Sequence, residues 1–106
     1  MKLVWYTKAK STWYRTLLHI HAEFGYRAAL TSRKETSKAS KQIVKFPQSG
    51  PIEPLLQPAE FEFRSVFCGT YNKLIYYISE ESIYITDVWD TRREPEAQAN
   101  ETKEIR

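Results

Sequence analysis

The chain has 106 residues, enough for one compact domain and too few for two. Its apolar fraction of 42%, with three Trp, seven Tyr and five Phe, excludes general disorder, because this much apolar surface can offset the entropy lost on folding. The formal charge of +3 is unevenly spread: residues 1–45 carry ten Lys or Arg against two acids, whereas residues 46–93 carry four against seven. The first half therefore produces a positive field that attracts phosphate backbones or acidic protein segments.

Cysteine use and hydropathy indicate the compartment. Cys68 is the only cysteine, so an intrachain disulfide is excluded and a reducing compartment is expected. No apolar run approaches the roughly 20 residues that span a bilayer, and the N-terminus lacks the apolar segment of a secretory signal. We therefore expect a cytoplasmic protein that does not contact a membrane.

The first predicted elements are a strand and a helix. Lys2–Tyr6 is β-branched and aromatic, which is typical of a short strand. Thr7 follows and offers a hydroxyl as a helix N-cap. A helix from about residue 8 to residue 24 is predicted by one apolar stripe at helical spacing, made of Trp13, Leu17, Ile20 and Phe24.

Gly25 is expected to end this helix, and a second helix from about residue 26 to residue 45 follows at once. Two adjacent helices with so short a connection predict an antiparallel hairpin. The inner stripe of the second helix is unusually small and polar, consisting of Ser32, Thr36, Ala39 and Ile43. Either the two helices approach closely there, or part of this face is a groove that another molecule fills.

The second half reads as a sheet. Turn residues from Phe46 to Pro51 end the second helix. Three strand-like runs separated by brief turns then predict an antiparallel meander: Phe61–Phe67, Tyr71–Ile78 and Ile83–Trp89. The first strand can join this meander while the helical hairpin covers one face.

The expected architecture is therefore a two-layer α+β domain with the order β-α-α-β-β-β over residues 1–95. Residues 96–106 are polar and acidic and contain no aromatic side chain. We expect this C-terminal tail to be frayed or disordered.

Four stretches, in this order and spacing, make the chain resemble the RelE/ParE superfamily, whose members are the toxins of bacterial type II toxin–antitoxin systems and include plasmid stabilisation proteins. The stretches are Leu3-Val4-Trp5, Phe24-Gly25-x-x-Ala28-Ala29, Phe46-Pro47-x-x-Gly50, and the run from Tyr76-Tyr77-Ile78 through Ile83-Tyr84-Ile85 to Val88-Trp89-Asp90-Thr91-Arg92-Arg93.

The resemblance implies growth inhibition that a cognate antitoxin neutralises, and it leaves three functions open. ParE-like members bind and inhibit DNA gyrase, RelE-like members cleave messenger RNA on the ribosome, and a repurposed member would only bind its partner. The ParE-like function is preferred, because the Phe-Pro-x-x-Gly turn and the terminal Arg-Arg pair look more like that branch. The target-binding residues would then be Arg64, Trp89, Arg92 and Arg93.

Metal-free RNA cleavage requires a general base, a general acid and cations around the phosphate. By the resemblance, these roles would fall to Arg64, Tyr71, Lys73, Asp90 and Arg92. The base is the missing part, since Asp90 and Thr91 stand where many members of the family have a histidine or tyrosine. Pairing of the Asp90 carboxylate with Arg92 or Arg93 is the better interpretation of that residue.

Other reactive side chains predict no further site. His19 and His21 are two residues apart on a helix, so they point to different sides and cannot share a metal ion, and both lie outside the family's active region. Cys68 adjoins a glycine turn and is expected to be a small buried apolar residue. We expect no metal and no small-molecule cofactor.

Overall fold

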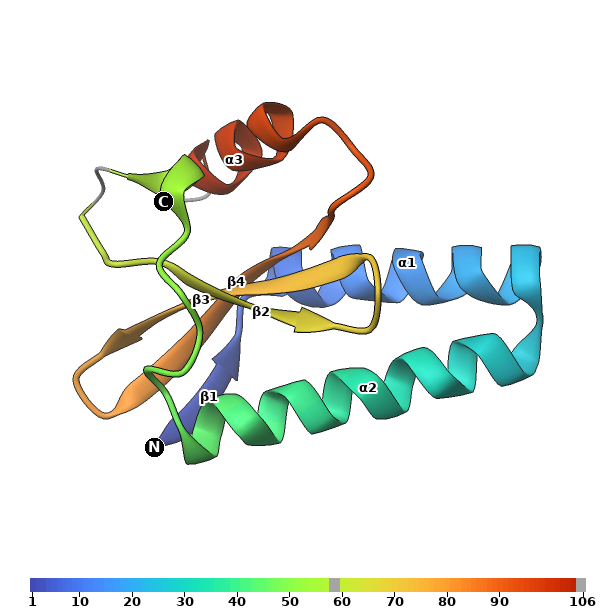
Figure 1. Ribbon diagram of the computed structural model, residues 1–106, viewed down its shortest axis with the longest axis horizontal. Helices are drawn as coiled ribbons and strands as arrows, with labels where there is room; N and C mark the ends of the chain where they lie inside the picture. Colours follow the sequence, from blue (N-terminus) through green and yellow to red (C-terminus); the bar gives the residue numbers. More distant parts are fainter. Residues whose placement is uncertain (58–59, 105–106) are drawn as a thin grey trace.

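One mixed four-stranded sheet organises the computed structural model of the protein, which describes residues 1–57 and 60–104 (Figure 1). The elements are β1 (Lys2–Trp5), α1 (Thr7–Phe24), α2 (Tyr26–Lys45), the 3-10 helix η1 (Pro54–Leu56), β2 (Arg64–Cys68), β3 (Asn72–Ser79), β4 (Ser82–Asp90) and α3 (Pro95–Glu104). The strand order is β1-β4-β3-β2, with β1 parallel to β4 and the other pairs antiparallel. The predicted α+β order and the antiparallel meander are confirmed.

Helices α1 and α2 form the predicted antiparallel hairpin, which covers one face of the sheet and projects past it (Figure 1). Gly25 joins them with φ of 93°, a left-handed conformation that glycine adopts without steric cost. Phe24 is 68% exposed because it lies at the projecting tip, so the predicted apolar stripe stops short of it. The predicted Thr7 cap is wrong: Thr7 is the first helical residue, and the extended residue Tyr6 precedes it without a side-chain cap.

The core between the hairpin and the sheet depends on small residues in α2. Thr36, Ala39 and Ile43 are buried as the inner stripe predicted. They pack with side chains from the sheet that include Leu74, Tyr76, Ile83, Ile85 and Val88. A bulge in the β3–β4 pairing places Ile85 and Val88 on the same face, although they are three positions apart. The bulge therefore keeps β4 apolar toward the helices from Ile83 to Val88.

The opposite face of the sheet carries a second core, which η1 and α3 cover (Figure 1). The expectation of a frayed tail from residue 96 is wrong as far as residue 104, because these residues belong to α3; residues 105–106 lie outside the described residues. The composition of residues 96–106 did not predict this helix, because α3 is held to the sheet mainly by hydrogen bonds of polar side chains. The Thr102 hydroxyl accepts a hydrogen bond from Trp89 Nε1 at 3.0 Å and donates to Asp87 Oδ2 at 2.9 Å. Gln98 bonds both backbone groups of Asp90 at 2.8 Å.

The Phe-Pro-x-x-Gly turn is held by one buried phenol. Tyr76 donates its hydroxyl proton to the Pro47 carbonyl at 2.7 Å, and the same oxygen accepts the Gly50 amide at 3.2 Å. A Cβ at Gly50 would lie 2.6 Å from the Ser65 carbonyl oxygen and 2.7 Å from the Tyr76 oxygen. Glycine is therefore required here by the close approach of the turn to β2 and β3.

Replacement of Thr102 by valine should destabilise the fold. The shape is retained, but Trp89 Nε1 and the buried Asp87 carboxylate each lose a partner, which should lower the free energy of unfolding by about 1–3 kcal/mol. Chemical denaturation followed by tryptophan fluorescence measures the change. The matched control is Thr7→Val, because Thr7 is exposed and its side chain has no hydrogen bond within the described residues; this variant should change stability by less than about 0.5 kcal/mol. Equal effects of the two variants would contradict the docking of α3.

Candidate functional site

Three of the predicted catalytic residues meet where β3 begins and β4 ends. Asp90 forms a two-pronged ion pair with Arg92, with Oδ1 to Nε at 3.1 Å and Oδ2 to Nη2 at 3.2 Å. The Arg92 backbone amide also donates to Oδ1 at 2.9 Å. The Arg92 guanidinium lies 4.4 Å from the centre of the Tyr71 ring. The interpretation of Asp90 as a partner of Arg92 is confirmed.

Asp90 is a weak base in this setting. Partial burial raises the pKa of its carboxyl group, but the hydrogen bonds and charge of Arg92, with the charge of Arg93, outweigh burial and hold the pKa below its ordinary value. The same pair raises the pKa of Arg92. A carboxylate that binds protons less readily than a free aspartate is poorly suited to take one from a ribose hydroxyl.

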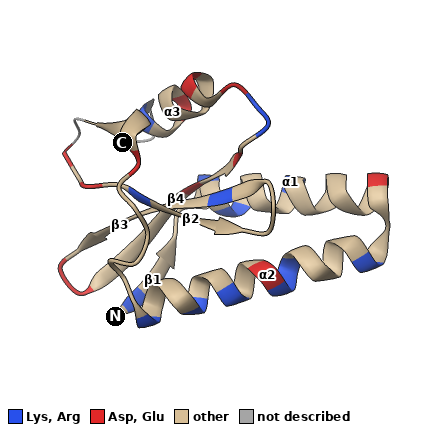
Figure 2. Ribbon diagram, viewed as in Figure 1, with Lys and Arg blue, Asp and Glu red and all other residues tan. Residues whose placement is uncertain are grey.

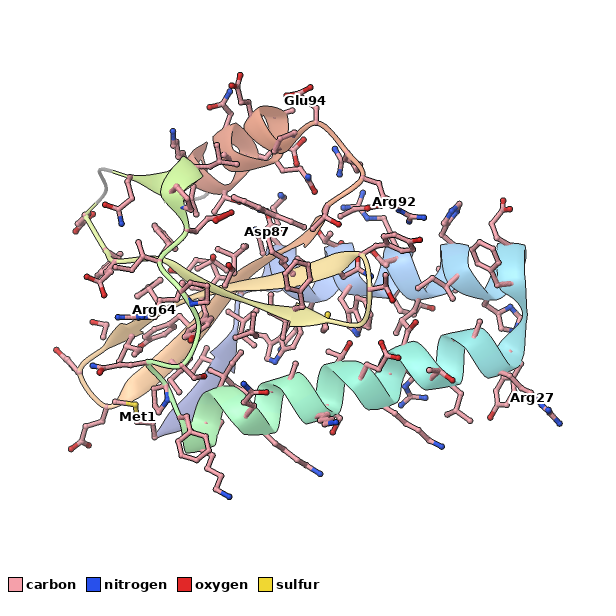
Figure 3. The ribbon with its side chains drawn as sticks, viewed as in Figure 1. Met1, Arg27, Arg64, Asp87, Arg92 and Glu94 are labelled. Carbon is pink, nitrogen blue, oxygen red and sulfur yellow. The ribbon has the colours of Figure 1, made fainter. Side chains whose placement is uncertain are left out.

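Arg64 and Lys73 form hydrogen bonds and ion pairs with residues other than Asp90 and Arg92. Arg64 donates to the Gly50 carbonyl at 2.8 Å and pairs with Glu62 at 2.8 Å; Figure 3 shows it well separated from Arg92. Lys73 pairs with the buried carboxylate of Glu53 at 2.9 Å. The Lys73 ammonium also lies 5.6 Å from the Trp89 ring. Of the five residues expected for a nuclease, Tyr71, Asp90 and Arg92 lie together, whereas Arg64 and Lys73 are bonded to other groups.

The expected target-binding surface also changes. Trp89 is only 2% exposed because it lies beneath α3, so its indole is not available to a partner in this structure. Arg92 and Arg93 are more than half exposed beyond the end of β4. The exposed cations of this surface are therefore the Arg-Arg pair, while Arg64 and Trp89 have structural contacts.

A cleft of about 380 Å³ lies between α1 and the end of β4, and we call it the α1–β4 cleft. Its lining is mostly polar: Thr12, Arg15, Thr16, His19, Ile20, Asn72, Asp90, Arg92, Arg93 and Glu101. His19, for which no functional role was expected, lies in the same cleft as the Arg-Arg pair. The available signal was the spacing of Arg15 and His19, four residues apart on one helix face. His21 points elsewhere, as predicted, with its ring edge toward Tyr26.

A second hollow follows α1, α2 and β1, and we call it the hairpin groove. It consists of two adjoining cavities of about 500 and 300 Å³ that share Leu3, Ser37 and Ser40. Apolar rings and aliphatic side chains face it, and basic residues border it: Trp5, Trp13, Tyr14, Leu17 and Val44, with Lys10, Arg33, Lys41 and Lys45. Figure 2 shows that Lys and Arg recur along the length of α2. The inner stripe of α2, for which two alternatives were open, is therefore mostly buried in the core, and the hairpin groove lies beside it, along Ser37, Ser40 and Val44.

The remaining reactive groups have structural surroundings. Burial, with a smaller contribution from Glu35, raises the pKa of the Cys68 thiol to about 11 despite a hydrogen bond with Thr36, so the thiol is protonated at neutral pH. Across residues 1–57 and 60–104, no three His, Cys, Asp or Glu side chains gather closely enough to hold a metal ion. None of the helices in the described part of the chain is long and apolar enough to cross a bilayer.

Comparison with known proteins gives a likeness of fold. No protein-family model matches the chain, and no curated protein matches its sequence. Ten chains of solved structures match its fold. One belongs to the chromosomal ParDE toxin–antitoxin system from P. aeruginosa, with a TM-score of 0.69 and 16% sequence identity over 85% of this chain and 95% of that chain. The fold is therefore that of a ParE-like α+β domain.

The ion pair of Asp90 should be visible in its titration. The carboxyl carbon of Asp90, followed by NMR, should titrate below the ordinary aspartate value of about 3.9, and Arg92→Gln should move the midpoint upward because burial is then less opposed. Since the folded pKa is lowered, the stabilisation by this pair is present above pH 3.9 and is lost as the pH falls through the folded value. Arg93→Gln, which removes only a longer-range charge, should shift the midpoint less. An unchanged midpoint in Arg92→Gln would contradict the assigned pairing.

Proposed function

We propose that this protein is the toxin of a bacterial type II toxin–antitoxin pair, that it acts by binding DNA gyrase, and that a cognate antitoxin keeps it inactive in the cytoplasm. The fold likeness to a chain of a ParDE toxin–antitoxin system supports the toxin role. The order and spacing of the four sequence stretches described above support it independently, because they do not depend on the structural comparison.

The pairing of the candidate catalytic residues favours gyrase binding over RNA cleavage. A metal-free ribonuclease needs a base, an acid and free cations around one phosphate. Arg64 and Lys73 are instead paired with Glu62 and Glu53, and Asp90 is paired with Arg92. An inhibitor that acts by binding needs only a complementary surface, and the exposed Arg92 and Arg93 provide a cationic one.

The hairpin groove fits the antitoxin. Its apolar floor and basic rim suit an acidic segment with one apolar side, since charge complementarity steers such a partner and apolar burial holds it. β1 pairs on one side with β4 and is the edge of the sheet in the described part of the chain, so an extended stretch of partner can also add along it. A segment that folds on binding could cover the groove and this edge together.

The target is tested by expressing the full chain in a bacterial host without its antitoxin. Growth should stop while messenger RNA stays intact, and the purified chain should block supercoiling by gyrase in a reconstituted reaction. Arg92→Gln with Arg93→Gln should weaken this inhibition at least tenfold, whereas Arg27→Gln with Lys103→Gln removes the same charge elsewhere and should leave it within about twofold.

Two outcomes would overturn this assignment. Rapid cleavage of ribosome-bound messenger RNA with normal supercoiling would assign the RelE-like activity instead. A chain that accumulates as a harmless, soluble protein would contradict toxin function and leave a member that only binds its partner.

The groove is tested with the product of the neighbouring reading frame, coexpressed with the full chain. An acidic small protein should copurify, and Arg33→Glu with Lys41→Glu should weaken the complex by about tenfold or more, because both charges border the groove. The control is Arg27→Glu with Lys103→Glu, an equal charge change outside the groove. Equal weakening by both pairs would show general charge attraction and would contradict the assigned groove.

A further inference from the structure

The α1–β4 cleft brings together cations that are far apart in the sequence. Arg15 and His19 come from one face of α1, and Arg92 and Arg93 follow β4. The cleft is about 380 Å³, within the range of about 300–1,000 Å³ typical of small-ligand sites. Neither the resemblance nor the compared structures assign a role to the α1 side of this cleft.

The charges of the cleft are not balanced internally. Its three guanidinium groups face the carboxylates of Asp90 and Glu101. Asp90 accepts hydrogen bonds from Nε and Nη2 of Arg92, but Arg93 reaches Glu101 only at 3.7 Å between two half-exposed side chains, an ion pair of little energetic value. Among residues 1–57 and 60–104, the side chains of Arg15 and His19 have no hydrogen bond or ion pair. An anion bound in the cleft could therefore accept hydrogen bonds from Arg15 and His19 without displacing a protein partner within the described residues.

The donor types match a phosphate group. Guanidinium groups bind phosphate oxygens in a forked geometry, and an imidazole N–H adds a single directed donor. The Thr12 hydroxyl lies in the same cleft, whereas that of Thr16 donates to the Thr12 carbonyl at 2.9 Å. The Arg92 guanidinium carbon lies 4.4 Å from the centre of the Tyr71 ring, and guanidinium groups and aromatic rings are the surfaces on which nucleobases stack. A carboxylate ligand would use the guanidinium groups equally well but would gain nothing from this platform.

We propose that the α1–β4 cleft binds a phosphate group carried by a nucleotide or by a nucleic-acid strand, with Arg15, His19 and Arg93 as its donors and the Arg92–Tyr71 pair beside the base. This site shares Arg92 and Arg93 with the surface proposed for gyrase, but Arg15 and His19 belong to it alone, and its ligand is tested without gyrase or antitoxin.

The experiment is a binding titration of the full chain with two probes, AMP and a ten-nucleotide single-stranded RNA, followed by calorimetry and by fluorescence anisotropy. At least one probe should bind, and Arg15→Gln with Arg93→Gln should weaken that binding about tenfold or more, since two charge-assisted contacts are lost. His19→Gln alone should weaken it by a smaller factor. These residues are exposed, so thermal unfolding of the variants should match that of the parent chain.

The control is Arg27→Gln with Lys38→Gln, which removes the same charge from exposed positions of α2 outside the cleft. Binding of AMP would identify a nucleotide site, whereas binding of the RNA alone, weakening with salt, would identify a strand. Failure of both probes to bind would overturn the proposal. Equal weakening by the control and the cleft variants would also overturn it, because binding would then follow net charge and not the cleft.

Discussion

The parallel pairing of β1 with β4 determines where the α1–β4 cleft and the hairpin groove lie. Parallel neighbours cannot be joined by a tight turn, so the chain must cross over between them. Here the crossover contains the α1–α2 hairpin and two strands of the meander. Because β1 leads directly into α1, the pairing lays α1 beside the end of β4 and creates the cleft that contains Arg15 and Arg92. It also makes β1 the edge of the sheet, next to the hairpin groove.

Strand β4 can occupy the centre of this arrangement because both of its faces are covered. The bulge opposite Ile75 and Tyr76 keeps Ile85 and Val88 turned toward the hairpin, while Trp89 turns toward α3. Asp87 is buried beside the bulge and is satisfied by Thr102 from α3 and by Lys8 from α1 at 3.3 Å. One carboxylate therefore links three elements, which explains why a helix with so little apolar surface stays docked.

The uneven charge of the sequence has a structural counterpart. The few cations of the strand half are neutralised locally, Lys73 by Glu53, Arg64 by Glu62 and Arg92 by Asp90. Many cations of the helical half instead line the groove and the cleft, where they face solvent. The residues that a resemblance to nucleases selects are therefore mostly structural, and the cations free to meet a partner lie on α1, α2 and the turn after β4.

Interactions between residues that are close in the sequence were sufficient to predict most of the helices and strands. Periodicity and the glycine between the helices defined α2 to its ends, and alternating apolar runs defined the three strands of the meander, because these signals depend on near neighbours. The pairing of Asp90 with Arg92 was also predictable, since only Thr91 lies between them. The docking of α3 depended on the contacts of Thr102 with Trp89 and Asp87, and the cleft on α1 lying beside the end of β4. Only the tertiary structure decided these, because a contact across more than ten residues leaves no periodic signal in the chain.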